Sequence, residues 1–430
     1  MNYKLYRIET YGMKNIKDLV TIDFLNQTID NKSSKKSNRI KAIYGSNGAG
    51  KSAIINSVKL YKLVVLDRDY LKQNDVVKKL NDTMNHQLNE FYFGIIFQEL
   101  SSNKISKYQL KIKLRNNLPF ISEETLSLLD DSTINGKYKM IYHVDEGNLT
   151  WFEIENEFTN HITDITKNLL TNSTLLSFIY NEVSYEDKII LNSNVYSDTN
   201  KHIAKQSSLV TALENAYMFP ANSLSVYSKD DFEEREIFTP ILYMTSGEDR
   251  ISKLVLDSYK SEIKKLTKFI KLFKPDFKEI YLDITESRDY YFCKKKMVYD
   301  AYTIDLFFES TGIKKLIDIF SSIEAVVSGK NVFIDELDSN ISCVYLNKLL
   351  EYLNDLQKGQ LCFTTHSLYP MTYLYKYTNS ICFLGETGKM VTWVKNGNYR
   401  PYLLYPEGMI DDSPFNIESF EFGAVFEAED

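Results

Sequence analysis

The fold is decided by one glycine-rich stretch, Gly45-Ser46-Asn47-Gly48-Ala49-Gly50-Lys51-Ser52. It fits the pattern G-x-x-x-x-G-K-[ST], in which glycines let the backbone curl until successive N–H groups point inward at phosphate oxygens. An apolar run over 40–44 predicts a strand before it, and helical spacing over 53–66 predicts a helix after it. A chance glycine turn is the alternative, but this context favours a phosphate site. We expect Lys51 to contact the β- and γ-phosphates of ATP and the Ser52 hydroxyl to bind Mg²⁺.

A second apolar strand is predicted over 332–334, and it ends in two carboxylates, Asp335 and Glu336. A phosphate site of this kind needs a metal-holding carboxylate on a neighbouring strand, and Asp335 would hold Mg²⁺ directly or through water. Glu336, just past the strand end, is placed to polarise the attacking water. The alternative is that the two carboxylates cap the helix that follows.

A third apolar strand is predicted over 361–364, and His366 follows it. A histidine there can contact the γ-phosphate or orient the water, although a lone histidine is more often structural. Strands alternating with helices in this part of the chain predict a parallel α/β core. Elsewhere, β-rich runs separated by polar turns predict an antiparallel sheet over 91–98, 107–115, 120–129 and 138–144.

These segments, in this order, resemble the ABC-type ATPase head shared by the SMC, RecF and overcoming-lysogenisation-defect (OLD) families. The resemblance implies a P-loop NTPase fold with a mixed sheet, an antiparallel β-subdomain and an α-helical insertion. The family motifs are Walker A at 45–52, Walker B at 332–336, the D-loop at Leu337-Asp338 and the switch histidine within 364–367. Past the D-loop, 339–342 departs from the Leu-His-Pro of many relatives.

Just before Walker B, residues 308–316 look like the degenerate E-S-x-G signature motif of the OLD-like branch. In that class two heads meet face to face, and the resemblance implies that Ser310 and Gly312 of one head complete the ATP site of the other, with Asp338 also at the nucleotide. ATP then joins the pair, and hydrolysis loosens it. Without the resemblance, Ser310–Gly312 would be an ordinary helix start.

Two further matches are expected from the same resemblance. Residues 11–15 look like the turn of the family's first hairpin, which lies near the nucleotide, and Gln98 could be the Q-loop residue. The predicted domains are an N-terminal ATPase lobe with Walker A and the β-subdomain (1–150), a mainly helical insertion (151–275), a C-terminal ATPase lobe with the remaining motifs (276–400) and an acidic tail (401–430).

Composition sets the broad class. The 430 residues are 43% hydrophobic and 25% charged, which excludes a mostly disordered or fibrous chain. No stretch approaches the ~20 apolar residues that a bilayer crossing needs, and the start of the chain lacks a secretory core. We therefore expect a cytoplasmic protein with no membrane partner. The four cysteines are far apart, which argues against a zinc site or a disulfide framework.

Charge is unevenly placed. The net charge is −7, but residues 407–430 carry eight acidic groups and no Lys or Arg, which leaves 50 acidic and 51 basic residues elsewhere. A nucleic-acid partner therefore remains open. A predicted amphipathic helix over 251–274 has seven lysines on its polar side, either a solvated face or a nucleic-acid patch. The acidic tail, interspersed with phenylalanines, is either a docking segment or edge strand, or a folded cap.

Taken together, these features predict the ATPase subunit of a bacterial antiphage or abortive-infection system. It would form a homodimer or higher homo-oligomer and act as an ATP-gated sensor or regulator of a separate effector, such as a nuclease, because the 64 residues after His366 are few for a nuclease domain. The alternatives are a RecF/SMC-like DNA-binding ATPase and a scaffold that binds ATP without turnover. A missing transporter signature and a missing N-K-x-D motif disfavour a transport ATPase and a GTPase.

Overall fold

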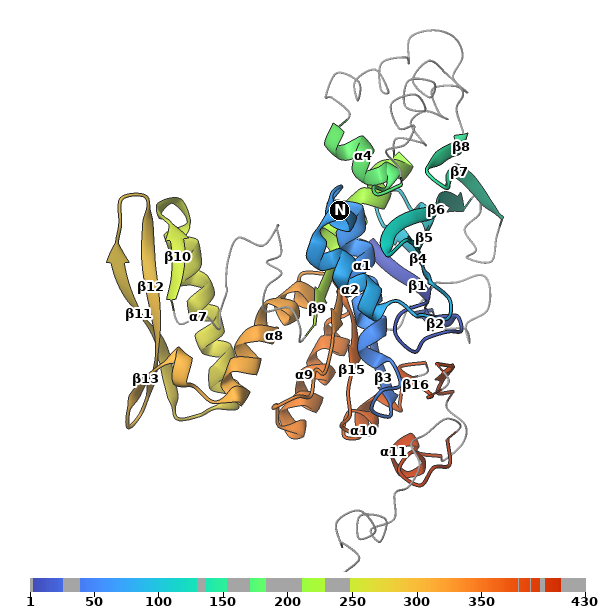
Figure 1. The fold of residues 1–430 in the computed structure, drawn as a ribbon. Coiled ribbons are helices and arrows are strands. Elements are labelled where there is room, and N and C mark those ends of the chain that lie inside the picture. Colours follow the sequence, from blue (N-terminus) through green and yellow to red (C-terminus); the bar gives the residue numbers. More distant parts are fainter. Residues whose placement is uncertain are drawn as a thin grey trace, which may run out of the picture.

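The computed structural model describes residues 3–25, 39–129, 137–152, 171–182, 211–228, 248–377, 379–386, 388–394 and 399–410. The described strands form three sheets, and Figure 1 shows the units that they build. In this part of the chain, no helix has both the length and the apolar character that a membrane crossing requires.

A six-stranded sheet forms the centre of the fold. Its strands, in spatial order, are β17 (Met390–Thr392), β16 (Ile381–Leu384), β3 (Ile40–Gly45), β15 (Gln360–Thr364), β14 (Asn331–Ile334) and β9 (Leu224–Tyr227). All pairings except that of β16 with β17 are parallel. Every residue of β3, β14, β15 and β16 is buried, as expected for parallel strands covered on both faces.

Alternate residues of these strands belong to two different cores. Ile43 and Phe333 pack in the core that contains α1 (Lys51–Leu66), whereas Tyr44 and Ile334 pack in the opposite one. The helices that contribute to that opposite core are α8 (Thr311–Val327), α9 (Cys343–Leu356) and α10 (Met371–Leu374). Helices therefore cover both faces of the sheet. The loops that follow the parallel strands lie together at one edge of it.

An antiparallel sheet of seven strands covers the other side of α1. Its strands, in spatial order, are β2 (Val20–Asp23), β1 (Tyr3–Tyr11), β4 (Glu90–Glu99), β5 (Ile105–Arg115), β6 (Leu118–Leu129), β7 (Tyr138–Asp145) and β8 (Asn148–Phe152). The Tyr61 ring of α1 stacks on Phe93 of β4, with centroids 4.8 Å apart. The predicted antiparallel sheet is thus confirmed, and α1 packs against strands of both sheets.

One carboxyl group is fully buried in this antiparallel sheet. Glu124 of β6 accepts hydrogen bonds from the hydroxyls of Tyr108 and Tyr142 and from the backbone N–H of Leu175. Burial raises the pKa of the Glu124 carboxyl, and these hydrogen bonds oppose that rise without cancelling it. The neighbouring Glu123 lies at the surface and pairs with Lys111, 2.7 Å away.

A smaller sheet forms a separate lobe, shown in yellow at the left of Figure 1. It contains β10 (Glu248–Ser252), β12 (Tyr290–Tyr299) and β11 (Phe277–Glu286) in that order, and β13 (Thr303–Asp305) also pairs with β12. Helix α7 (Leu256–Phe273) packs on it. The helix predicted over 251–274 therefore starts later, because 248–252 pairs with β12 as a strand.

Helix α8 joins this lobe to the central sheet. Its residues Leu316 and Phe320 pack in the core of the lobe, whereas Ile319 and Ile323 pack in the core under the six-stranded sheet. Other described helices are short or peripheral, among them η1 (Tyr70–Lys72), α2 (Asn74–Thr83), α4 (Leu175–Glu182), η3 (Phe219–Ser223), η4 (Lys253–Val255), η5 (Leu306–Phe308) and α11 (Pro401–Leu404).

Strand β9 lies within the range 151–275, for which we predicted a mainly helical insertion. Its four residues pair with β14 in parallel and complete one edge of the central sheet. A run this short cannot be distinguished from helix or loop by periodicity. Most of the acidic tail, 411–430, lies outside the described residues, and the boundaries of the four domains stay predictions.

Candidate nucleotide-binding site

The glycine-rich loop connects β3 to α1, as predicted. Gly48 and Gly50 have φ angles of 82° and 108°, and Gly50 is the residue that precedes the first turn of α1. The buried Lys51 side chain folds back over the loop, and its Nζ donates hydrogen bonds to the carbonyls of Gly45 and Ser46 at 2.8 and 2.9 Å. The loop thus has the backbone curl and the lysine position that a phosphate site requires.

The turn after β1 packs against this loop. The Asn15 side-chain amide donates to the carbonyl of Gly48 at 2.7 Å, and a Cβ added to Gly50 would lie only 2.8 Å from Asn15 Oδ1. Lys14 is held in turn, because its N–H donates to the carbonyl of Thr83 and its carbonyl accepts from Asn85. The hairpin turn therefore lies beside the glycine-rich loop, as the family resemblance implied.

Asp335 and Glu336 follow β14 at the same edge of the sheet. The Thr364 hydroxyl, at the end of β15, donates to Asp335 Oδ1 and accepts the N–H of Glu336 at 2.8 Å. The N–H of Asp335 donates to the carbonyl of Tyr227 in β9 at 2.9 Å. Asp335 is buried and Glu336 is half-buried, with a left-handed φ of 48°. The Asp335 carboxylate and the backbone N–H groups of both residues are thus held by the strands on either side.

The loop lysine and the strand-end carboxylates share one site. Burial lowers the pKa of Lys51, whereas the negative charges of Asp335, Glu336 and Asp338 act to raise it. Because parallel strands end at one edge, β3, β15 and β14 bring together residues that are almost 300 positions apart. Ser52, on the first turn of α1, is half-buried beside Lys51.

Two buried polar atoms at this site suit a polar ligand. The Ser46 hydroxyl oxygen and Asp338 Oδ1 are buried without a hydrogen-bond partner among the described residues. The other Asp338 oxygen accepts the N–H of Ser367 at 3.1 Å. Within the same residues, no cluster of three or more His, Cys, Asp or Glu side chains could hold a metal by itself. This fits Mg²⁺, which binds through one or two carboxylates together with substrate phosphates and water.

The signature segment begins α8 and lies close to the residues that follow the D-loop. Ser310 is the N-cap of α8, where its hydroxyl accepts the N–H of Ile313 at 3.4 Å. A Cβ added to Gly312 would lie 3.1 Å from the carbonyl of Asn340. The ordinary role of a helix start is therefore present, and the role of Ser310 and Gly312 in a partner's ATP site stays a prediction.

The structure bears differently on the predictions for His366 and Gln98. His366 is exposed just after β15, at the edge where Asp335 also lies, and its catalytic role stays a prediction. Gln98 pairs with Lys4 at the opposite end of β1 from the hairpin turn, and its side chain bonds to Tyr6 and Asn103. The Q-loop prediction for Gln98 is wrong, because the antiparallel pairing places it at the far edge.

Comparison with known proteins agrees with this geometry. Residues 40–371, more than half of the chain, match the family model described as "AAA domain, putative AbiEii toxin, Type IV TA system".

The chain belongs to this family.

The fold of this AAA-domain family member is a P-loop NTPase fold, which confirms the predicted class and a relationship to abortive-infection ATPases. A solved structure entitled "Crystal structure of the SmcHead bound to the C-winged helix domain of ScpA" is similar over 91% of this chain and 98% of that chain, at 12% identity and a TM-score of 0.43. No curated protein matches the sequence.

Sequence reasoning assigned no role to three residues of the AAA-domain site, although they lie in the segments 11–15, 364–367 and 308–316 that the family resemblance had singled out. Asn15 donates to the glycine-rich loop, Thr364 bonds to the Asp335 carboxylate and to the backbone N–H of Glu336, and Lys315 lies buried near those two residues. Thr364 lies two residues before His366, within the switch-histidine motif at 364–367, and this position was a visible signal for it. The other two could not be found from spacing, because their partners lie on distant segments.

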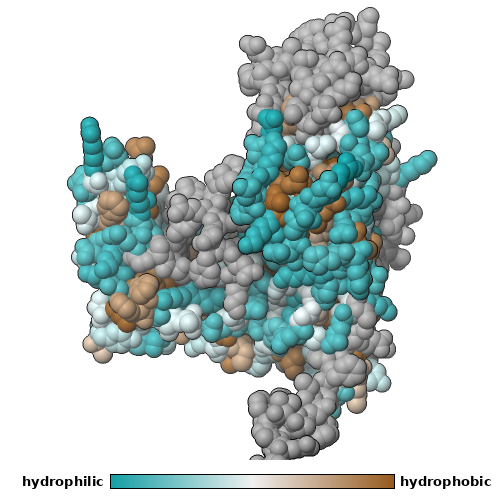
Figure 2. Space-filling view, viewed as in Figure 1, coloured by the Kyte–Doolittle hydropathy of each residue, from teal (hydrophilic) through white to brown (hydrophobic). Residues whose placement is uncertain are grey.

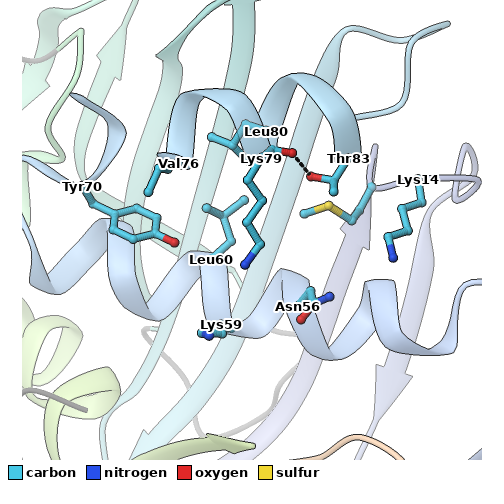
Figure 3. Close-up of a pocket in the computed structure, with 10 residues that line it drawn as sticks. Lys14, Asn56, Lys59, Leu60, Tyr70, Val76, Lys79, Leu80 and Thr83 are labelled. Atoms are coloured by element: carbon cyan, nitrogen blue, oxygen red, sulfur yellow. Dashed lines mark hydrogen bonds between the residues drawn. The ribbon is translucent and has the colours of Figure 1, made fainter. Parts of the chain in front are cut away.

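A second feature of this AAA-domain protein is a pocket between α1 and α2, shown in Figure 3. Its cavity volume is about 30 Å³, and it opens to solvent. Three lysines line it from separate elements, and Lys79 extends from α2 towards α1. None of its ten lining residues is acidic, and they are Met13, Lys14, Asn56, Lys59, Leu60, Tyr70, Val76, Lys79, Leu80 and Thr83. The lining thus combines three lysines with apolar side chains.

Proposed function

We propose that this chain binds and hydrolyses ATP, and that ATP state controls a separate effector in a bacterial antiphage or abortive-infection system. The observation that carries the ATPase part is the shared site of Lys51 and the carboxylates at the edge of a parallel sheet. The defence part is supported by the family description alone, which is an associational argument.

Each side chain at the site has a role suited to its position. Lys51, now bonded to loop carbonyls, would exchange them for the β- and γ-phosphates. Ser52 and Asp335 would hold Mg²⁺, which when bound neutralises charge on the phosphates. Glu336, whose N–H is fixed by Thr364, would orient and polarise the attacking water. His366 would add a contact to the γ-phosphate.

A second copy of the chain would complete the site. Ser310 and Gly312 begin α8 at the surface, directly after two exposed aromatic residues. Phe307 and Phe308 are 67% and 69% exposed, and their rings meet edge to face at 5.2 Å. Figure 2 shows hydrophobic surface at this corner of the molecule, near β13. An apolar pair beside the signature segment supports an ATP-dependent homodimer through this face.

The site assignment is tested by two substitutions. Lys51→Ala should abolish ATP binding, because it removes the only lysine in the glycine-rich loop. Glu336→Gln should keep ATP binding, slow hydrolysis by about a hundredfold or more and lengthen the life of the ATP-bound dimer. The measurements are equilibrium ATP binding, phosphate release and sedimentation with ATP.

Three results would contradict these assignments. Normal ATP affinity in the Lys51→Ala chain would remove the phosphate site. Normal turnover in the Glu336→Gln chain would mean that another group orients the water. No phosphate release by the wild-type chain at high concentration would favour an ATP-binding scaffold. For the defence role, cells that carry the complete system with Lys51→Ala should lose protection against phage.

The alternative is a DNA-binding ATPase of the RecF/SMC kind. The lysine-lined pocket favours it, because phosphate groups are the natural ligands of such a lining. The lysine-rich segment 251–274 gives weaker support to a DNA-binding function, because Lys253, Lys265 and Lys274 each pair with a nearby carboxylate. DNA affinity of the full chain that falls steeply with salt would support this function, and absence of DNA binding at low salt would exclude it.

A further inference from the structure

The hairpin turn after β1 contains a strained residue that the end of helix α2 holds in place. Lys14 has a φ of 51°, a left-handed conformation that residues with a side chain rarely adopt. Its N–H donates at 2.6 Å to the carbonyl of Thr83, the last residue of α2, and the two residues lie side by side in Figure 3. Such a carbonyl has no partner within its own helix. The turn therefore uses a hydrogen-bond acceptor that α2 leaves open.

Asn85 ties the chain just after α2 to the same turn. It is only 6% exposed. Its N–H donates to the carbonyl of Gly12 at 2.9 Å, and its side-chain amide donates to the carbonyl of Lys14 at 2.7 Å. Its side-chain oxygen accepts the N–H groups of Gln87 and Leu88 at 3.0 and 3.2 Å. A buried amide that loses a partner is costly, so these bonds oppose movement of the turn away from α2.

On its other side, the turn holds the glycine-rich loop. The Asn15 side-chain amide donates to the carbonyl of Gly48 at 2.7 Å. Because a peptide is planar and trans, the direction of this carbonyl also sets the direction of the next N–H group, that of Ala49. That N–H donates at 3.3 Å to the carbonyl of Ser46, which also accepts Lys51 Nζ at 2.9 Å. A continuous series of direct hydrogen bonds thus runs from the end of α2 to the phosphate-binding lysine.

We propose that Asn15 is a positioning residue for ATP, and that Asn85 and the end of α2 set ATP affinity through it. The inference rests on the ATP-binding function proposed above. A residue in a sparsely populated conformation relaxes when a restraint is removed, so loss of an Asn85 bond would let Lys14 relax and turn Asn15 away from Gly48. Only Val76 and Leu80 of α2 are buried, so the position of a surface helix is coupled to the ATP site.

The test measures equilibrium binding of ATP to the full chain. Asn15→Ala removes the bond to Gly48, and the net value of one such bond predicts a fall in ATP affinity of about three- to tenfold. Asn85→Asp keeps the side-chain acceptor and removes the donor to Lys14, so it should also lower ATP affinity, by about two- to tenfold. Thermal unfolding checks that each variant chain is folded.

A control and a double variant separate this coupling from a merely structural effect. Asn81→Ala is the matched control, because the Asn81 amide donates to the carbonyls of Val77 and Asn117 and not to the turn. Its ATP affinity should match the wild type. If Asn85 acts through Asn15, the double variant Asn15→Ala with Asn85→Asp should lose no more affinity than Asn15→Ala alone. Independent structural effects would instead multiply.

A second measurement uses the reciprocity of coupled sites. If the end of α2 strengthens ATP binding, ATP must strengthen the bonds at the end of α2 by the same factor. With a saturating non-hydrolysable ATP analogue and Mg²⁺, hydrogen–deuterium exchange over residues 84–89 should therefore slow about two- to tenfold in the wild type. In Asn15→Ala, the saturating analogue should leave exchange over these residues unchanged.

Three results would overturn the inference alone in a wild-type chain that binds ATP. They are wild-type ATP affinity in Asn15→Ala, wild-type ATP affinity in Asn85→Asp, and losses that multiply in the double variant. If Asn85→Asp does not fold, the exchange measurement on the wild type and Asn15→Ala decides, and equal slowing in both chains contradicts the coupling. A wild-type chain that binds no ATP overturns the proposed function, and the inference with it.

Discussion

A methyl group added to Gly50 tests whether the glycine-rich loop must hold its present curl for ATP to bind. In the structure Gly50 has a φ of 108°, a conformation that residues with a side chain rarely adopt. The new Cβ would also lie 2.8 Å from Asn15 Oδ1 and 3.0 Å from Ile16 Cγ1. Gly50→Ala therefore strains the backbone and at the same time pushes against the hairpin turn.

The expected loss of ATP affinity in Gly50→Ala follows from the backbone strain and from the contact of the new Cβ with the hairpin turn. A side chain in a sparsely populated backbone region costs about 1–3 kcal/mol, and relief of the contact with Asn15 adds to that, for a total of about 2–4 kcal/mol. If ATP needs the native loop, this energy is lost from binding, and ATP affinity should fall about 30- to 1,000-fold. Equilibrium binding of ATP to the full chain measures it directly.

Two other glycines provide matched controls. Gly48 has a φ of 82° in the same loop, but nothing lies within 4 Å of its added Cβ, so Gly48→Ala should cost only about 1–2 kcal/mol, or about 5- to 30-fold in affinity. Gly329 has a φ of 99° and equally open surroundings between α8 and β14. Gly329→Ala should lower the melting temperature and leave ATP affinity unchanged. Wild-type ATP affinity in the Gly50→Ala chain would refute the reasoning.

Two further predictions concern the dimer and the antiparallel sheet. Phe307→Asp should weaken ATP-dependent dimerisation about tenfold or more while ATP affinity at the chain's own site stays the same; unchanged sedimentation with ATP would exclude this face from the interface. The raised pKa of Glu124 means that the folded chain binds the carboxyl proton more tightly than the unfolded chain does. The stability that this proton contributes is therefore full below about pH 4.5 and is lost as the pH rises through the pKa of the folded chain. The melting temperature of Glu124→Gln relative to the wild type should therefore rise as the pH increases above about 4.5, and a difference that stays constant with pH would contradict the assignment.

The parts of the site that a contiguous motif encodes could be predicted from the sequence. The residues 45–52 must follow a strand and open a helix for their amides to converge, and the structure has that arrangement. The apolar run 332–334 could be recognised as a strand because two carboxylates follow it, and β14 begins one residue earlier, at Asn331. In both cases the physical cause of the structure lies within about ten neighbouring residues.

The parts that depend on pairing between distant segments could not be predicted. Gln98 is a plausible Q-loop residue by position in the chain, but the register of β1 with β4 places it at the wrong edge of the fold. Strand β9 contains only four residues, and its role comes from the backbone of β14 beside it. Such pairing is decided by which surfaces can be buried together, and a single sequence does not state that choice.

Helix α8 shows why the two halves of the site belong to one mechanism. Its first residues, next to Ser310, face a second copy in the proposed dimer, and Lys315 follows little more than one turn later, near Glu336. A helix is too stiff for one turn to move without the next. Contact with a partner at Ser310 and Gly312 would therefore also set the distance between Lys315 and Glu336. If ATP hydrolysis depends on dimerisation, no further element is needed to connect the two, because the same rigid helix α8 lies at the dimer contact and beside the strand-end carboxylates.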